Sequence, residues 1–241
     1  MKKYIYCLLF VSLISSFIPL SNTSSGIKVI FDSNINKRLR GPIGKAALAY
    51  YAYYGCPDTT YIHYGTLCRD TIINDSSKEV MFAYSRHRET FLCPVFDSLS
   101  DGVVFSTMLH EFFHTLAKDT ILVRPFDIFN GEATVLGYKG LSVYLQRKDG
   151  TRTFMWAVEE GSAEVCTAGI IPGYKSGNPL YAAAASKVAQ FVNNKMITLQ
   201  DLITLQKESN FKNFCARTMN KPLWLITNKD IEFVIKVFMF N

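Results

Sequence analysis

Two histidines, one helical turn apart in a strongly periodic apolar stretch, restrict the fold of this chain more than any other feature. Residues 101–117 repeat apolar side chains at helical spacing, which predicts an amphipathic helix with one face in the core. The apolar stripe comprises Val104, Met108, Leu109, Phe112, Phe113 and Leu116. His110 and His114 lie about 40° apart around such a helix, because each residue advances by about 100°. Their imidazoles can therefore present nitrogen atoms to one point.

The run from His110 to His114 has the form His-Glu-x-x-His, with Glu111 as its second residue. Two imidazoles in this arrangement can bind one zinc ion, and the glutamate borders the metal without ligating it. Its carboxylate can accept a proton from zinc-bound water, whose pKa the metal lowers to about 7. The pattern predicts a catalytic Zn²⁺ ion with Glu111 as general base. The alternative is a buried helix whose histidines form ordinary hydrogen bonds.

A catalytic zinc ion needs a third protein ligand and one open position. Residues 115–120 contain no histidine, so the three-histidine form of the motif is absent. His63 and His87 lie upstream, in a predicted strand or loop, and are interpreted as ordinary polar residues. The cysteines form no Cys-x-x-Cys pair, which argues against a cysteine zinc site. The third ligand is therefore expected downstream of the helix.

A second predicted helix, residues 154–168, carries the candidates for this ligand. Glu160 and Glu164 lie on one face of it, and the small residues around them permit another helix to approach closely. We expect Glu160 to complete a His-His-Glu site. Glu164, one turn further on, is expected to hold a ligand histidine by its second nitrogen. Glu159 is interpreted as an exposed residue at the end of the helix.

At these residues the chain resembles the zincin metallopeptidases, and within them the gluzincins. Gluzincins combine the His-Glu-x-x-His helix with a ligand glutamate on a following helix, often in the form Glu-Gly-x-Ala. Residues 160–163, Glu-Gly-Ser-Ala, have this form. The resemblance implies that His110, His114 and Glu160 ligate zinc and that Glu111 is the general base.

The resemblance covers residues 90–170. It also implies a strand before the first helix that pairs antiparallel with the substrate, a role assigned to residues 90–94. The chain departs from the family in the connection between the ligands, because 45 residues separate His114 from Glu160. This gap is longer than in the best-known members of the family, so residues 120–152 are expected to fold as an excursion of their own.

Peptide hydrolysis by such a centre also needs a hydrogen-bond donor to the oxyanion of the tetrahedral intermediate. A tyrosine or a histidine usually has this role. The candidates are Tyr138, Tyr144, Tyr174 and Tyr181. We favour Tyr174 or Tyr181, because both follow the helix that carries the glutamates.

The first 25 residues have the order of a secretory signal peptide. Two lysines form a short basic start, residues 4–20 are mainly apolar, and residues 21–25 are small and polar. The alternative is a retained membrane anchor, for which this interrupted apolar run is short. We expect a signal peptide over residues 1–25 and a single zincin-like metallopeptidase domain over residues 26–241. The mature protein is then secreted or held in the periplasm or cell envelope, with no stable membrane span.

The charges of the chain give no indication of nucleic-acid binding. The net charge of +6 falls to +4 without the two lysines of the signal peptide, and the other basic residues are scattered in short pairs. A nucleic-acid surface would cluster them on one face or element.

In an oxidising compartment, Cys56 and Cys68 are close enough in sequence to close a loop. The expected partner is a peptide or protein substrate, and the oligomeric state stays open.

The pattern of elements predicts an α+β fold, with a strand-rich first part and a helical later part. The small mixed or antiparallel sheet of the first part is expected to pack on the helix of residues 101–117. Expected strands are residues 27–31, 60–64, 71–73, 79–85 and 90–96. Expected helices are residues 40–54, 101–117, 154–168, 180–193 and 199–209. Residues 133–145 are interpreted as a helix or a helix-to-strand transition, and residues 148–151 as a turn.

Together these features predict an exported zinc metallopeptidase, a hydrolase in which Glu111 activates zinc-bound water for attack on a peptide carbonyl. One catalytic Zn²⁺ ion is expected. The alternatives are a secreted zincin-fold protein that binds without catalysis and a secreted effector or toxin. The intact Glu111 argues against the first alternative, since a non-catalytic site has no need of a carboxylate at this position.

Overall fold

The computed structural model describes residues 28–55, 59–65, 70–72, 78–80 and 82–239. The predicted signal peptide and the predicted Cys56–Cys68 pair lie outside these residues. Cys93 is disulfide-bonded, whereas Cys166 and Cys215 are buried cysteines that form no disulfide. None of the helices in the described ranges is both long and apolar enough to cross a membrane.

The first sheet has four strands in the order β1 (Lys28–Phe31), β2 (Thr59–Tyr64), β6 (Glu89–Leu92) and β5 (Ala83–Arg86). The first three run parallel, and β5 pairs antiparallel with β6 at the edge. Two short strands, β3 (Asp70–Ile72) and β4 (Lys78–Val80), pair separately. The expected strand over residues 79–85 is therefore two strands that belong to different sheets.

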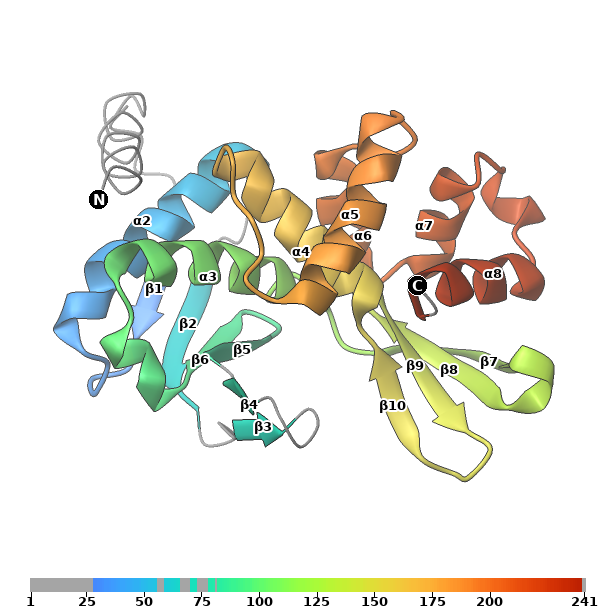
Figure 1. Ribbon diagram of the computed structural model, residues 1–241, viewed down its shortest axis with the longest axis horizontal. Helices are drawn as coiled ribbons and strands as arrows, with labels where there is room; N and C mark the ends of the chain where they lie inside the picture. The colour runs from blue at the N-terminus through green and yellow to red at the C-terminus, as the bar shows by residue number, and fades with distance from the viewer. Residues whose placement is uncertain (1–27, 56–58, 66–69, 73–77, 81, 240–241) are drawn as a thin grey trace.

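Two long helices cover the first sheet (Figure 1): α2 (Lys37–Tyr54) and α3 (Asp101–His114). Asn36 caps the start of helix α2, because its side chain accepts a hydrogen bond from the backbone N–H of Arg38 in the first turn. The helix ends at Gly55, whose φ of 69° suits glycine. A 3₁₀ turn, η1 (Pro94–Ser98), leads into α3. The predicted apolar stripe of α3 is buried, and the helix ends at His114, three residues earlier than expected.

The excursion predicted between the two ligand helices is a second sheet, antiparallel throughout. Its order is β10 (Arg152–Met155), β9 (Ser142–Arg147), β8 (Ala133–Lys139) and β7 (Ile121–Ile128), with a 3₁₀ turn η2 (Phe129–Gly131) between β7 and β8. The expectation of a helix or a transition over residues 133–145 is wrong. Strands β8 and β9 pair across a two-residue turn at which Gly140 has a φ of 56°, and a glycine adopts this conformation without strain.

The rest of the chain is helical. Predicted helices α4 (Ala157–Ile170), α5 (Pro179–Asn193) and α6 (Leu199–Glu208) are present, and α4 begins late because residues 152–155 pair with β9. The structure adds α7 (Phe211–Thr218), a 3₁₀ turn η3 (Leu223–Leu225) and α8 (Asn228–Met239), which were not predicted. The capping box predicted at the start of α6 is confirmed.

The elements share one hydrophobic core that includes residues from α2 to α8. Helix α4 is central to it, because it packs against α3, α5 and α6. In Figure 1, α4 lies between the first sheet with its two helices and the second sheet with the C-terminal helices. The predicted α+β class is confirmed, and α4 is the element that brings residues far apart in sequence to one place.

Candidate metal centre

Three side chains from α3 and α4 converge on one point. Nε2 of His110 lies 3.1 Å from Nε2 of His114 and 3.0 Å from Oε2 of Glu160, and the latter two atoms are 3.5 Å apart. A tetrahedral zinc ion with bonds of about 2.0–2.1 Å sets its ligand atoms about 3.4 Å apart. Within the described part of the chain, this is the only group of three or more such side chains that could hold a metal ion.

Close helix packing places Glu160 at this point. The next residue, Gly161, faces the backbone of Ala184 on α5, and a Cβ atom at Gly161 would lie 2.7 Å from the carbonyl carbon and oxygen of Ala184. Because glycine has no Cβ, α4 and α5 approach more closely than any other residue would permit. On the other side, the buried Phe112 and Phe113 fix α3 in the core.

The second nitrogen of each histidine also contacts a carboxylate. Nδ1 of His110 lies 3.1 Å from Oε1 of Glu164, and Nδ1 of His114 lies 3.0 Å from Oε1 of Glu159. A carboxylate at Nδ1 favours the tautomer with the proton on that nitrogen, so that the lone pair of Nε2 faces the shared point. The expected contact of Glu164 is present. The interpretation of Glu159 as exposed is wrong, since this residue is buried.

The histidines and glutamates of this cluster shift one another's pKa values. Burial by itself would lower the pKa of His110 and of His114, but the neighbouring glutamates outweigh it and raise both pKa values. Burial would raise the pKa of Glu160, and the two histidines instead hold it well below its usual range. The carboxylates therefore create a strong preference for positive charge between the two helices, which protons or a divalent cation can satisfy.

Glu111 lies on the side of α3 that faces the edge of the first sheet. It is buried, and its Oε2 accepts a hydrogen bond of 2.8 Å from the hydroxyl of Ser85 on β5. The substrate-pairing role assigned to residues 90–94 needs correction. Strand β6 is hydrogen-bonded on both sides, to β2 and to β5, so it has no free edge. Among the described strands of this sheet, β5 is the terminal strand next to the centre.

Of the four candidate tyrosines, two lie at the centre. The ring of Tyr181 stacks on the imidazole of His110, with 5.8 Å between ring centroids. Tyr174 contacts Glu164, and burial together with this carboxylate raises the pKa of its phenol. Tyr138 and Tyr144 instead stack on aromatic residues of α7 and β10, respectively.

The remaining histidines lie elsewhere. Nδ1 of His63 is 2.9 Å from a carboxylate oxygen of Asp32, and Nδ1 of His87 is 3.1 Å from the carbonyl oxygen of Ala117. Neither belongs to the metal group, in line with their interpretation as ordinary polar residues.

Two residues of the centre were not predicted from the sequence. The Ser142 hydroxyl donates to Oε2 of Glu159, and Nε2 of Gln206 donates to its Oε1 at 2.6 Å. Ser142 carries no signal of such a role. Gln206 does carry one, because it is a polar residue in the buried stripe of α6 that otherwise consists of leucine and isoleucine.

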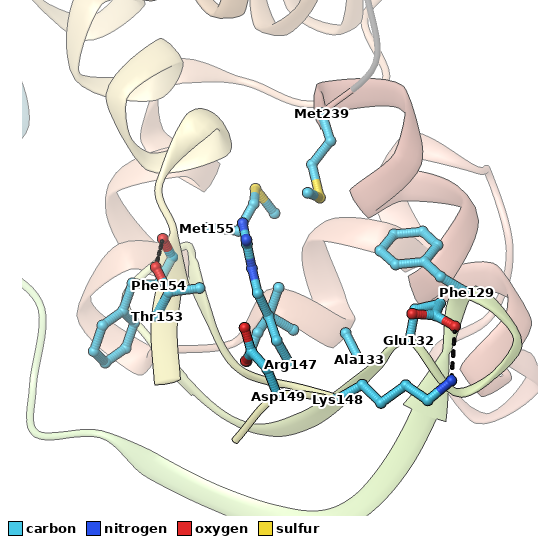
Figure 2. Close-up of a pocket in the computed structure, with 11 residues that line it drawn as sticks. Phe129, Glu132, Ala133, Arg147, Lys148, Asp149, Thr153, Phe154, Met155 and Met239 are labelled. Atoms are coloured by element: carbon cyan, nitrogen blue, oxygen red, sulfur yellow. Dashed lines mark hydrogen bonds and ion pairs between the residues drawn. The ribbon is translucent and has the colours of Figure 1, made fainter. Parts of the chain in front are cut away.

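Figure 2 shows a separate pocket on the second sheet. Its lining includes Leu145 and Met155 of the sheet, Met239 at the end of α8 and charged residues such as Arg147. None of the residues of the metal centre lines this pocket. The pocket is therefore lined by other residues than those of the metal centre.

The side chains define a candidate metal centre with two imidazoles, one carboxylate and an adjacent glutamate that does not belong to the ligand set. No protein-family model, curated protein or solved structure matches this chain. What the centre does is therefore inferred from its own chemistry.

Proposed function

We propose that this protein is a zinc-dependent peptidase of zincin type. The observation that carries the proposal is the convergence of Nε2 of His110, Nε2 of His114 and Oε2 of Glu160 at mutual distances of 3.0–3.5 Å. Two imidazoles and one carboxylate are a usual ligand set for catalytic zinc, and three protein ligands leave a coordination position open. A structural zinc site closes all four positions with protein ligands, so the ligand count supports catalysis.

When bound, zinc would polarise a substrate carbonyl and make a coordinated water more acidic. The residues of the chain supply the remaining chemistry. Glu111 is next to a ligand in sequence but is not one of the three converging side chains. Its carboxylate, which accepts a hydrogen bond from Ser85, would accept a proton from the attacking water. It can then donate this proton to the leaving amine. Tyr181, whose ring lies on His110, is the favoured donor to the oxyanion.

A peptide substrate is supported by the position of the terminal strand. Strand β5 packs against α3 and carries Ser85, the partner of Glu111. An extended peptide can add to a free strand edge through backbone hydrogen bonds, a mode that recognises any peptide and leaves selectivity to side-chain pockets. A peptide paired with β5 would therefore pass beside the proposed general base.

Export is part of the proposal. Residues 1–25 have the basic, apolar and small polar segments in the order typical of a signal peptide, and disulfides such as that of Cys93 are typical of oxidising compartments. Both features favour a protein that acts outside the cytoplasm, as a secreted or cell-envelope enzyme.

Metal analysis and a cleavage assay test the proposal together. We expect about one zinc ion per chain, cleavage of unfolded proteins or a peptide library, loss of cleavage with a chelator and recovery with Zn²⁺. Glu111→Gln should keep the zinc and lose the cleavage. A protein that binds zinc but cleaves no substrate would be a non-catalytic binding protein. A protein that binds no zinc would contradict the metal centre itself.

A further inference from the structure

The carboxylate of Glu159 is held from three sides although it is outside the ligand set. Its Oε1 lies 3.0 Å from Nδ1 of His114 and accepts a hydrogen bond of 2.6 Å from Nε2 of Gln206, while its Oε2 accepts from Ser142. The three partners come from three different elements, α3, α6 and β9. A buried carboxylate is retained only where such partners compensate for its lost hydration.

The orientation of the Gln206 amide is fixed by the backbone on its other side. Gln206 is fully buried, and its Oε1 accepts a hydrogen bond of 2.8 Å from the backbone N–H of Leu141. Because the amide oxygen is committed to Leu141, the amide nitrogen must face Glu159.

The turn between β8 and β9 encloses this amide closely. The positive-φ residue Gly140 lies so near to Gln206 that a Cβ atom there would overlap the amide, and its N–H donates to the Ser209 hydroxyl at 2.8 Å. The amide of Gln206 has no room to rotate, so its two hydrogen bonds hold the turn and the Glu159 carboxylate at fixed positions relative to each other.

From this geometry we propose that Gln206 is a positioning residue of the metal centre. It holds the Glu159 carboxylate against Nδ1 of His114, and through it keeps Nε2 of His114 directed at the metal. Helix α6 and the β8–β9 turn thereby belong to the centre although neither supplies a ligand. This inference rests on the proposed zinc centre.

The need for such a residue follows from the charges on α4. Glu159 is adjacent to Glu160 in sequence and lies near His114 together with it, so the two carboxylates repel each other. Without a donor from Gln206, Glu159 would lose one of its buried hydrogen bonds, and a rotation away from Glu160 would also release Nδ1 of His114. Outer partners of metal ligands typically account for about 10–100-fold in metal affinity.

The test compares Gln206→Met, a substitution of similar size and shape, with Leu202→Ala on the same helix. Leu202 is also buried in α6, but its side chain has no donor or acceptor and cannot hydrogen-bond to Glu159. The full chain is loaded with Zn²⁺ for chelator competition and with Co²⁺ for visible absorption, and thermal unfolding of the metal-free protein is followed separately. We expect Gln206→Met to weaken zinc binding by about tenfold and to shift the Co²⁺ bands. Leu202→Ala should lower the unfolding temperature without either change.

A combination of substitutions shows whether Gln206 acts through Glu159. In a Glu159→Ala background, Gln206→Met should cost little additional zinc affinity, because residues that act as a unit are not additive. Gln206→Asn, which keeps a buried amide but is one methylene too short to reach both partners, serves if Gln206→Met does not fold. Wild-type zinc affinity and Co²⁺ bands in the Gln206 variants would overturn the inference and leave the proposed function standing. Failure of the wild-type protein to bind zinc would overturn both.

Discussion

Oε1 of Glu164 lies 3.1 Å from Nδ1 of His110, on the side of the imidazole that faces away from the shared point of the ligands. A single helix, α4, thus contacts both nitrogens of His110, because Oε2 of Glu160 lies 3.0 Å from its Nε2. Helical geometry explains how this is possible. Residues four apart lie about 40° apart around the axis, whereas neighbours lie about 100° apart, so Glu160 and Glu164 share His110 and Glu159 reaches His114.

The role of Glu111 predicts a variant that binds zinc but is inactive. Glu111→Gln keeps the size of the side chain and can still accept the Ser85 hydrogen bond, but it cannot take a proton from water. We expect peptide cleavage to fall by about 10²–10⁴-fold, the usual contribution of a general base. Zinc content and unfolding temperature should match the wild type. Cleavage at the wild-type rate would remove Glu111 from the mechanism.

The contact of Glu164 with His110 predicts a loss of metal affinity in Glu164→Ala. Removal of the carboxylate frees the imidazole to rotate and weakens Nε2 as a ligand, so zinc should bind about 10–100-fold more weakly. Competition with a chelator measures the difference. Glu132→Ala is a matched control, because Glu132 is exposed and its carboxylate pairs with Lys148 next to the second sheet. Equal zinc affinity in the two variants would contradict the role of Glu164.

The packing of Gly161 on Ala184 predicts that a single methyl group disturbs the centre. In Gly161→Ala the new Cβ would lie 2.7 Å from backbone atoms of Ala184, so α4 and α5 must separate. We expect a loss of about 1–3 kcal/mol of unfolding free energy, as for other overpacked cores. Because Glu160 is the preceding residue, zinc affinity should also decrease.

A second glycine gives the control for this substitution. Gly44 lies inside α2 with open space where a Cβ would be added, so Gly44→Ala should stabilise the protein by about 0.5–1 kcal/mol through helix propensity. Chemical denaturation measures both variants. If both substitutions raised the stability, α4 and α5 would not be in the close contact described.

Local periodicity explains which parts of the centre could be predicted. His110, Glu111 and His114 lie in a helix whose apolar stripe is evident in the sequence, and Glu160 lies in another helix that was located to within three residues at each end. The fold class followed from the same patterns. These features depend on neighbours a few positions away, so they can be predicted from the sequence.

The burial of Glu159 could not be predicted from periodicity. Its burial depends on Ser142 and Gln206, which are 17 and 47 residues away in sequence. In a single sequence, a glutamate at the start of a helix is most simply interpreted as solvated. The second sheet was missed for a related reason, because Gly137 interrupts the alternation within β8 and Gly140 lies in the turn that follows it. Glycine is required at both positions by the approach of another segment, Ile121 in one case and Gln206 in the other.

The stacking of Tyr181 on His110 predicts an effect on catalysis alone. Tyr181→Phe keeps the ring against the imidazole and removes the hydroxyl, so zinc affinity should be unchanged. If this hydroxyl donates to the oxyanion, kcat should fall by about 10²–10³-fold with little change in KM. Tyr144→Phe, at a tyrosine that stacks on Phe154 in the second sheet, is the control. Equal kcat values for the two variants would assign the oxyanion donor to another group.

The contacts of Asp230 at the start of α8 predict a pH dependence of the stability of the fold. Its carboxylate accepts from Lys221 and from the backbone and hydroxyl of Thr227 at the start of α8, and these contacts lower its pKa to about 2. The folded pKa is thus below the value in the unfolded chain. The stabilisation is fully present above about pH 4, the ordinary value of an aspartate, and is lost as the pH falls toward 2.

The variant Asp230→Asn isolates this contribution. At pH 7 it should lower the unfolding free energy by about 1 kcal/mol, the usual worth of a helix cap, and the difference from the wild type should shrink as the pH falls below 4. Asp119→Asn, at an exposed position between α3 and β7, should change the stability little at any pH. Denaturation curves recorded between pH 2 and 7 compare the three proteins. A difference that stayed constant over this range would show that the charge of Asp230 does not stabilise α8.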